Sequence, residues 1–316
     1  MKKVLATLAL LPALAFAQTY PTKPVHVVLP FGPGGVADIT TRTIAPKLGD
    51  ELGQPIVVEN MPGAGGIRAA ETVAHADPDG HTLLLLTNGN AVSQALFKSL
   101  PYDPANDFAM ISTVSYFSMV VVTGAQSKLH TLRDVITTAK ANPGKLNVGT
   151  ISPGGTQHLA GELFLSTAGI QALVVPHKTT GEVIVSVRNG NVDIAFDFIA
   201  PLLSAIKSGQ LRALAVTAAK RFPGLADVPT VIEAGVPGYD VASWNALAAP
   251  AKAPRPVIDK VRSALIKALA APDVQKRFAE LGVEGRASTP EELKDFYASE
   301  TKRWTRVVER AGIPKQ

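Results

Sequence analysis

The chain has 316 residues, of which 46% are hydrophobic and 18% are charged, so it can bury a sizeable core. This length exceeds one typical domain and predicts two. The formal net charge of +5 is mild and is not gathered in a Lys/Arg-rich block, which argues against a nucleic-acid-binding face. Cysteine is absent, which excludes a disulfide framework and thiolate metal sites.

The N-terminal segment is typical of a secretory signal peptide. A lysine pair precedes the apolar run VLATLALLPALAFA, which ends in the small-residue pattern Ala15-Phe16-Ala17. Pro12 interrupts this run, which is shorter than the roughly 20 residues that a membrane-spanning helix needs. We therefore expect residues 1–17 to be removed by cleavage after Ala17, and we expect the mature chain to be periplasmic.

The following segment alternates between short β-branched runs and helical patterns. Strands are expected at 25–31, 55–60 and 81–88, and helices at 38–53 and 63–76. This βαβαβ order predicts a mainly parallel sheet with helical crossovers. Residues 100–118 contain the turn-favouring pair Asp103-Pro104 and are expected to form a connecting segment.

A second alternating set predicts another α/β lobe. Strands are expected at 119–124, 145–151, 173–177, 192–197 and 211–218, and helices at 131–144, 156–169, 181–190 and 200–210. Thr131 is a candidate N-cap for the first of these helices. For the C-terminal part, the sequence predicts an extended segment at 243–254 followed by helices at 256–281 and 290–311. Two strand–glycine loop–helix units, VVLPFGPGGVAD and NVGTISPGGTQH, occupy comparable places in the two sets.

The first of these glycine loops is a candidate anion site. Unpaired N–H groups and the dipole at a helix N-terminus favour a negative charge there. Residues 32–37 also match the G-x-G-x-x-A pattern of dinucleotide-binding loops, with Glu59 at the end of the next strand. Pro33 within the turn and the expected export argue against a nucleotide, so no cofactor is expected.

Three candidate ligand loops contain neither Lys nor Arg, namely LPFGPGGVAD, LTNGNAVSQ and GTISPGGTQH. An anion held there would be neutralised by backbone dipoles and hydroxyl groups, which allows release without breaking a buried ion pair. A glycine after a strand can also simply form a tight turn, so a single loop is not decisive. Two such loops in two similar lobes favour a ligand held between them.

Individual polar residues near these loops leave alternatives open. Asp38 could cap its helix or orient a water or a ligand amine, and Thr156 could offer its hydroxyl to the ligand. His158 could face the cleft or pack inward. Asp197 could cap the helix that follows it, or attract an α-amino group on the ligand.

Catalytic and metal-binding patterns are missing from the sequence. It contains no G-x-S-x-G and no H-E-x-x-H motif, and its six histidines are scattered. His158 and Glu162 could share a helix face, but a third metal ligand is not evident. We therefore expect neither a catalytic nor a metal site, and an exported α/β protein with such loops is interpreted as a binding protein.

Six segments carry a family resemblance. They are YPTKPVHVVLPFGPGGVADITTR, VVENMPGAGGIRAAETVAHADPDGHTLLL, LPYDPANDF, HLAGELF, LRALAVTAAKRFPGLADVPTVIEAGVPGYDVASWNALAAPAKAP and ETKRWTRVVERAGI. Together they resemble Bug-type solute receptors, the periplasmic substrate-binding proteins of tripartite tricarboxylate transporters. The long block starting at Leu211 is the most specific, and the resemblance covers nearly the whole mature chain.

This resemblance implies a fold and a domain division. The expected fold is an α/β, two-lobed periplasmic binding protein of type II-like architecture, with two mainly parallel sheets flanked by helices and a ligand cleft between the lobes. Lobe 1 would comprise residues 18–118 plus 244–316, and lobe 2 residues 119–243. The hinge is expected near residues 116–121 and 239–244.

The resemblance also implies a set of ligand contacts, made largely by main-chain N–H groups and ordered waters. The candidates are Phe31, Gly32, Gly34, Gly35, Val36, Asp38, Asn88, Gly89, Asn90, Ser152, Gly154, Gly155, Thr156, His158 and Asp197. Two segments depart from the family pattern. Residues 177–181 replace the usual Tyr-Lys-Gly, and residues 88–90 replace a usual Thr-His turn, so the ligand cannot be transferred from a relative.

The expected function is capture of a small organic carboxylate and its delivery to the membrane components of a tripartite tricarboxylate transporter. Closure of the two lobes around the ligand is the expected mechanism, and the protein is expected to be a monomer that binds no nucleic acid. One alternative is an exported enzyme or accessory protein acting on an aromatic or aliphatic acid. Another is a ligand-sensing partner of a two-component system.

Overall fold

The computed structural model describes residues 20–151 and 155–315. The predicted signal peptide, residues 1–17, and the candidate ligand residues Ser152 and Gly154 lie outside the described residues. Within those two ranges, no helix is both long enough and apolar enough to cross a membrane.

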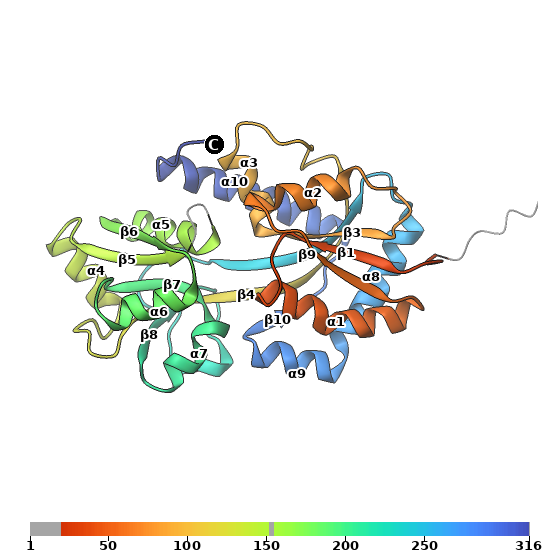
Figure 1. Cartoon of the computed structure of the whole chain (residues 1–316). Helices are drawn as coiled ribbons and strands as arrows, with labels where there is room; N and C mark the ends of the chain where they lie inside the picture. The colour runs from red at the N-terminus through yellow and green to blue at the C-terminus, as the bar shows by residue number, and fades with distance from the viewer. Residues whose placement is uncertain (1–19, 152–154, 316) are drawn as a thin grey trace, which may run out of the picture.

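The first sheet confirms the predicted βαβαβ unit. Its strands are β1 (Val25–Leu29), β2 (Ile56–Asn60), β3 (Thr82–Thr87), β4 (Phe108–Gly124), β9 (Ala242–Pro250) and β10 (Val283–Gly285). β1 pairs in parallel with β2 and β3, as helical crossovers require. β9 runs antiparallel between β3 and β4, and β10 adds antiparallel to β4. The parallel strands therefore occupy one side of a mixed sheet (Figure 1).

The second sheet repeats this plan. Its further strands are β5 (Leu146–Ile151), β6 (Ala172–His177), β7 (Ile194–Phe198) and β8 (Leu211–Val216). β5 pairs in parallel with β6 and β7, whereas β4 pairs antiparallel with β7 and β8. The α/β class is confirmed, but both sheets are mixed rather than mainly parallel: two of the five strand pairings in the first and two of the four in the second are parallel.

Strand β4 belongs to both sheets. Its 17 residues pair with β9 as far as Ser118, and with β7 and β8 from Met119 onward. The prediction of a connecting segment over 100–118 was therefore wrong from Phe108 onward. The polar residues Ser112, Thr113 and Ser115 obscured the strand, because all three are buried inside the sheet and break the expected hydrophobic pattern.

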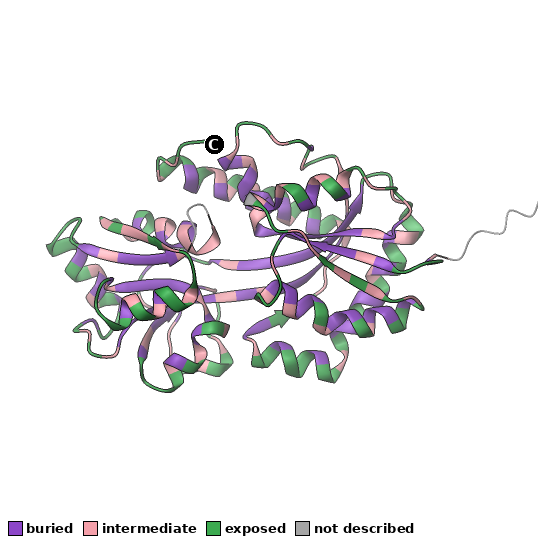
Figure 2. Cartoon of the chain, viewed as in Figure 1, coloured by how far each residue is buried: buried purple, intermediate pink, exposed green. Residues whose placement is uncertain are grey.

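Helices cover both faces of each sheet. They are α1 (Val36–Leu52), α2 (Ile67–Ala74), α3 (Asn88–Leu96), α4 (Leu132–Ala141), α5 (Thr156–Ala168), α6 (Thr180–Arg188), α7 (Ile199–Lys207), α8 (Arg255–Ala270), α9 (Pro272–Glu280) and α10 (Pro290–Arg310). α1, α8 and α9 enclose one apolar cluster, and α2, α3 and α10 enclose another that continues under α4 and α5. Figure 2 shows the strands between these layers as the most buried part of the chain.

Local signals explain where several helices begin. Thr131 accepts a hydrogen bond from the Asp134 N–H at 3.1 Å, which confirms it as the N-cap of α4. The single helix predicted over 256–281 is instead two helices. Pro272 starts α9, because proline has no N–H to continue α8 but fits the first turn of a new helix.

Both tryptophans of the chain converge on one buried carboxylate. The indole N–H groups of Trp244 on β9 and Trp304 on α10 each donate to Glu300 Oε2 at 3.1 Å. Arg303 donates to the other carboxylate oxygen at 3.2 Å. Since Trp244 lies near the start of β9, this cluster fixes α10 to a strand that runs beside β4.

We predict that Glu300→Ala lowers the free energy of unfolding by about 3 kcal/mol, because it leaves two buried indole donors unpaired. Urea unfolding followed by tryptophan fluorescence measures this change. Glu309→Ala, which truncates an exposed glutamate on the same helix, should change the free energy by less than about 0.5 kcal/mol. Equal effects of the two substitutions would contradict this role of Glu300.

Candidate ligand-binding site

The start of α1 presents backbone donors at the predicted glycine loop. Gly35 is the N-cap residue and has no side chain with which to cap the helix. The first intrahelical bond runs from the Ile39 N–H to the Gly35 carbonyl at 2.9 Å. The N–H groups of residues 36–38 therefore lie outside the helical ladder and are oriented toward the loop side of the helix end.

The buried carboxylate of Asp38 anchors this loop through hydrogen bonds. Its carboxylate is 3% exposed and accepts hydrogen bonds of 2.9 Å each from the Gly34 N–H, Arg42 Nε and Asn60 Nδ2. Burial alone would raise the pKa of Asp38, but these three donors outweigh it and hold the pKa below its usual value. Asn60 also donates to the Phe31 carbonyl at 3.0 Å, so both ends of the loop are anchored.

Two of these anchoring residues were missed from the sequence. Arg42 lies one turn after Asp38 in α1 and donates to Asn60 Oδ1 at 2.8 Å as well as to Asp38. Its i,i+4 spacing from Asp38 was the available signal for that ion pair. Asn60 ends β2, and only the parallel pairing of β1 with β2 brings it beside the loop. The loop itself is cation-free, but a half-exposed guanidinium lies next to it.

Residues 88–90 form the first turn of α3 rather than the predicted loop turn. Thr87 precedes the helix, and Asn90 Oδ1 accepts hydrogen bonds from its N–H at 2.9 Å and its hydroxyl at 3.0 Å. Asn90 therefore closes the helix start. Gly89 lies between the two asparagines, where an added Cβ would be 3.3 Å from Thr87 Oγ1.

The start of α3 meets the start of α5 from the other sheet. Asn88 Nδ2 donates to Thr156 Oγ1 at 3.1 Å. Gly155 is the N-cap residue of α5 and, like Gly35, has no side chain for capping. The first intrahelical bond there runs from Leu159 N–H to the Gly155 carbonyl at 3.0 Å. Candidate residues that are 68 positions apart in the sequence are therefore in direct contact.

Asp197 organises the helix starts of the second sheet. It is fully buried and accepts hydrogen bonds from Thr180 Oγ1 at 2.6 Å, Gln157 Nε2 at 3.2 Å and the Phe198 N–H at 2.7 Å. These donors come from the first turns of α5 and α6 and from the N-cap of α7. Burial raises the pKa of Asp197, and the three hydrogen bonds only partly offset it.

His158 lies on α5 beside Glu162, as its i,i+4 spacing predicted. Its Nε2 atom is 3.8 Å from Glu162 Oε1. Burial lowers the pKa of His158 and raises that of Glu162, so both side chains are shifted toward their neutral forms. Across residues 20–151 and 155–315, no group of three or more His, Asp or Glu side chains could hold a metal ion.

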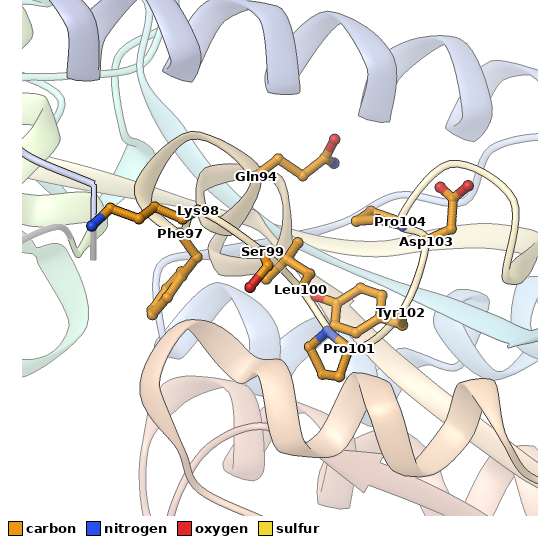
Figure 3. Close-up of a pocket in the computed structure, with 9 residues that line it drawn as sticks. All are labelled: Gln94, Phe97, Lys98, Ser99, Leu100, Pro101, Tyr102, Asp103 and Pro104. Carbon is orange, nitrogen blue, oxygen red and sulfur yellow. The ribbon is translucent and has the colours of Figure 1, made fainter.

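A surface hollow of about 620 Å³ lies away from these residues, where α3 passes into the following loop. It is lined by Gln94, Phe97, Lys98, Ser99, Leu100, Pro101, Tyr102, Asp103 and Pro104. Figure 3 shows Lys98 and Asp103 extending to opposite ends of this open hollow, so its charged groups do not converge on a common point. The helix starts described above are therefore the better candidate site.

We predict that Asp197→Asn changes the dependence of stability on pH. A carboxyl group with a raised native pKa makes the native state bind its proton more tightly than the unfolded state does. The wild-type chain should therefore lose stability relative to the variant as pH rises from about 3.9, the ordinary Asp pKa, through the raised native pKa.

Thermal unfolding of both proteins at pH values from about 3.5 to about 8 measures this difference, because this range starts just below the ordinary Asp pKa and extends well above it. The exposed Asp227→Asn is the matched control and should follow the wild-type profile. A constant difference between wild type and Asp197→Asn at every pH would show that Asp197 carries no raised pKa.

Comparison with known proteins identifies the family of this chain. The model of the tripartite tricarboxylate transporter family receptor matches residues 40–313. The solved structure of the periplasmic binding protein BugD is 32% identical with a TM-score of 0.79, and the alignment covers 94% of this chain and 100% of BugD. An R. palustris protein solved with adipate is 31% identical with a TM-score of 0.82, covering 94% and 100% of the two chains.

MatC from Rhodopseudomonas palustris, solved with bound malate, is 33% identical with a TM-score of 0.77, covering 92% of this chain and 100% of MatC. These likenesses extend over both sheets and are not limited to the glycine loops. The chain has the fold of a periplasmic binding protein and belongs to the tripartite tricarboxylate transporter receptor family.

Proposed function

We propose that this receptor captures a small organic carboxylate in the periplasm and delivers it to the membrane components of a tripartite tricarboxylate transporter. The observation that carries the proposal is the meeting of α3 and α5 at the Asn88–Thr156 bond, beside the glycine-capped start of α1. The adipate and malate bound by the two R. palustris relatives support this ligand class. We propose further that the mature form starts at Gln18 and acts as a monomer.

The electrostatics of the site favour an anion that can be released. Each helix N-terminus carries about half a positive charge together with unpaired N–H donors. Arg42, a cation beside the first loop, already pairs with Asp38. A carboxylate held by the starts of α1 and α5 would therefore be neutralised by backbone dipoles, without breaking an ion pair to enter or leave.

The candidate contacts divide into two roles in this proposal. The Gly34 N–H is already used by Asp38, and both Asp38 and Asp197 are satisfied by the protein, so these aspartates position the loops. The groups that we propose as ligand contacts include N–H donors at residues 35–36 and 155–156, the side chains of Asn88 and Thr156, and Phe31, which is 41% exposed. His158, Gly32 and Gly89 would line the space around them.

We propose that binding closes two lobes about β4 and β9. The exchange of β4 partners between Ser118 and Met119 supports a boundary there, and the start of β9 at Ala242 supports a second crossing close to residue 243. Residues 18–118 and 244–316 would then move against residues 119–243. The 3.1 Å Asn88–Thr156 bond joins the two sides, so opening would break it and ligand contacts to both sides would favour the closed state.

We predict that a binding carboxylate at one hundred times its Kd stabilises the mature protein by about 2.7 kcal/mol. A thermal-shift screen with malate, adipate, citrate, glutamate and benzoate tests this. Gly34→Glu should abolish the shift, because it puts a negatively charged side chain beside the proposed anion. No heavy atom lies within 4 Å of a Cβ added at Gly34, so the new side chain would enter open space.

Gly144→Glu is the matched control for that substitution. Gly34 and Gly144 both have positive φ, 85° and 73°, and both have open space at the added Cβ, so the backbone strain is comparable. Gly144 lies between α4 and β5, at the opposite end of β5 from the α5 start. Binding that survives Gly34→Glu unchanged, or that fails equally in Gly144→Glu, would contradict the loop assignment.

A further inference from the structure

Three polar side chains form a row across the first sheet. Strand pairing places Thr87 of β3 opposite Asn245 of β9, and Asn245 opposite Ser115 of β4. Directly paired residues point to the same face of a sheet, so the three side chains lie side by side. This face is the one covered by α1, because Leu85 and Leu247, two positions before Thr87 and two after Asn245, pack in the α1 cluster.

The row lies at the end of the sheet where the candidate site begins. Thr87 is the last residue of β3, and parallel sheets present their ligand sites at the carboxyl ends of the strands. β1 pairs Val28 with Leu84, and continuing this register by three residues sets Thr87 at the level of Phe31. The row therefore lies at the same end of the sheet as the loop that leads from β1 into α1.

Two members of the row lack a partner. Ser115 is 0% exposed and Asn245 is 2% exposed, yet Ser115 Oγ and Asn245 Nδ2 make no hydrogen bond to any described residue. Burying a polar group without a partner costs free energy, and buried groups of this kind are normally satisfied. Thr87 differs, because its hydroxyl bonds to Asn90. The two open groups are adjacent and neutral: the Asn245 amide nitrogen can donate, and the Ser115 hydroxyl can donate or accept.

We propose that Ser115 and Asn245 bind a hydroxyl group on the carbon chain of the ligand, so that this receptor selects hydroxylated carboxylates over their unsubstituted counterparts. The inference rests on the proposed function. A hydroxyl fits better than a second carboxylate, because these two side chains offer neither a cation nor the several N–H donors of a helix start that would offset a buried anion. Asn245 Nδ2 can donate to the oxygen of the ligand hydroxyl, while Ser115 Oγ accepts the hydrogen bond that this hydroxyl donates.

Matched ligand pairs that differ by one hydroxyl group test this proposal. The pairs are succinate and malate, glutarate and 2-hydroxyglutarate, tricarballylate and citrate, and phenylacetate and mandelate. Isothermal titration calorimetry on the mature protein should show at least about tenfold tighter binding of the hydroxylated member of the pair that binds best. A site built to bond a substrate hydroxyl rejects the analogue that lacks it, because its polar groups are then left unpaired.

Ser115→Ala should reduce that preference to about onefold by weakening only the hydroxylated member, while the ligand-free protein stays at least as thermostable as wild type. Asn245→Leu should behave in the same way. A structural role would not produce this combination, because removing a satisfied buried hydroxyl lowers stability. Ser112→Ala provides that contrast on the same strand. Ser112 is equally buried, but its hydroxyl donates to the Thr113 carbonyl and accepts from the Ser288 N–H, so the variant should lose stability and keep the preference.

Two results would overturn the inference in distinguishable ways. Binding of carboxylates with no preference for the hydroxylated members, or with a preference that Ser115→Ala leaves intact, would overturn it while the proposed function stands. Binding of none of the eight acids, nor of the acids in the thermal-shift screen, would overturn both.

Discussion

The candidate site depends on two helices whose N-cap residue is a glycine. Gly35 and Gly155 occupy the N-cap positions of α1 and α5, where most helices place a Ser, Thr, Asp or Asn that satisfies a backbone N–H. Without that side chain, the first-turn donors of both helices must be satisfied by water or by a ligand. Other helices of the same chain show the contrast, since Thr131, Thr179 and Thr289 cap α4, α6 and α10 with their own hydroxyl groups.

Two buried aspartates support these uncapped starts in different ways. The Asp38 carboxylate accepts hydrogen bonds from the cationic Arg42 and from two neutral N–H donors, and its pKa is lowered. Asp197 accepts only neutral donors, and its pKa is raised. Each carboxylate accepts hydrogen bonds from the protein itself, which makes an acidic residue compatible with the proposed anion site beside it. The negative charge of Asp38 is matched by Arg42, whereas that of Asp197 is not matched by any of its three hydrogen-bond donors.

The sequence was most informative where the signal is local. The β-branched runs predicted the parallel strands correctly, and the spacing of the glycine loops predicted that the starts of α1 and α5 would be equivalent. The segment from Phe108 was missed because a strand buried on both faces need not alternate, and the three-residue β10 is too short to leave a pattern. α3 was read as a turn because Asn and Gly favour turns unless a preceding cap such as Thr87 starts a helix.

The sequence pointed to the loops of the candidate site, but it gave less information on the structural role of each residue in them. Asp38, Asn90 and Asp197 are hydrogen-bonded into the scaffold, and their partners lie on other elements or depend on helix geometry that a linear pattern does not specify. The unpaired state of Ser115 and Asn245 arises from pairing between strands that are about 130 residues apart, a separation at which sequence periodicity carries no information. The ligand contacts themselves stay a prediction.

A crystal structure of the mature protein with its carboxylate bound tests the central claim most directly. The account predicts that the carboxylate oxygens accept hydrogen bonds from backbone N–H groups at the starts of α1 and α5, with Arg42 still paired to Asp38. A carboxylate bound instead by the guanidinium of Arg42, or seated in the hollow beside Tyr102, would contradict it.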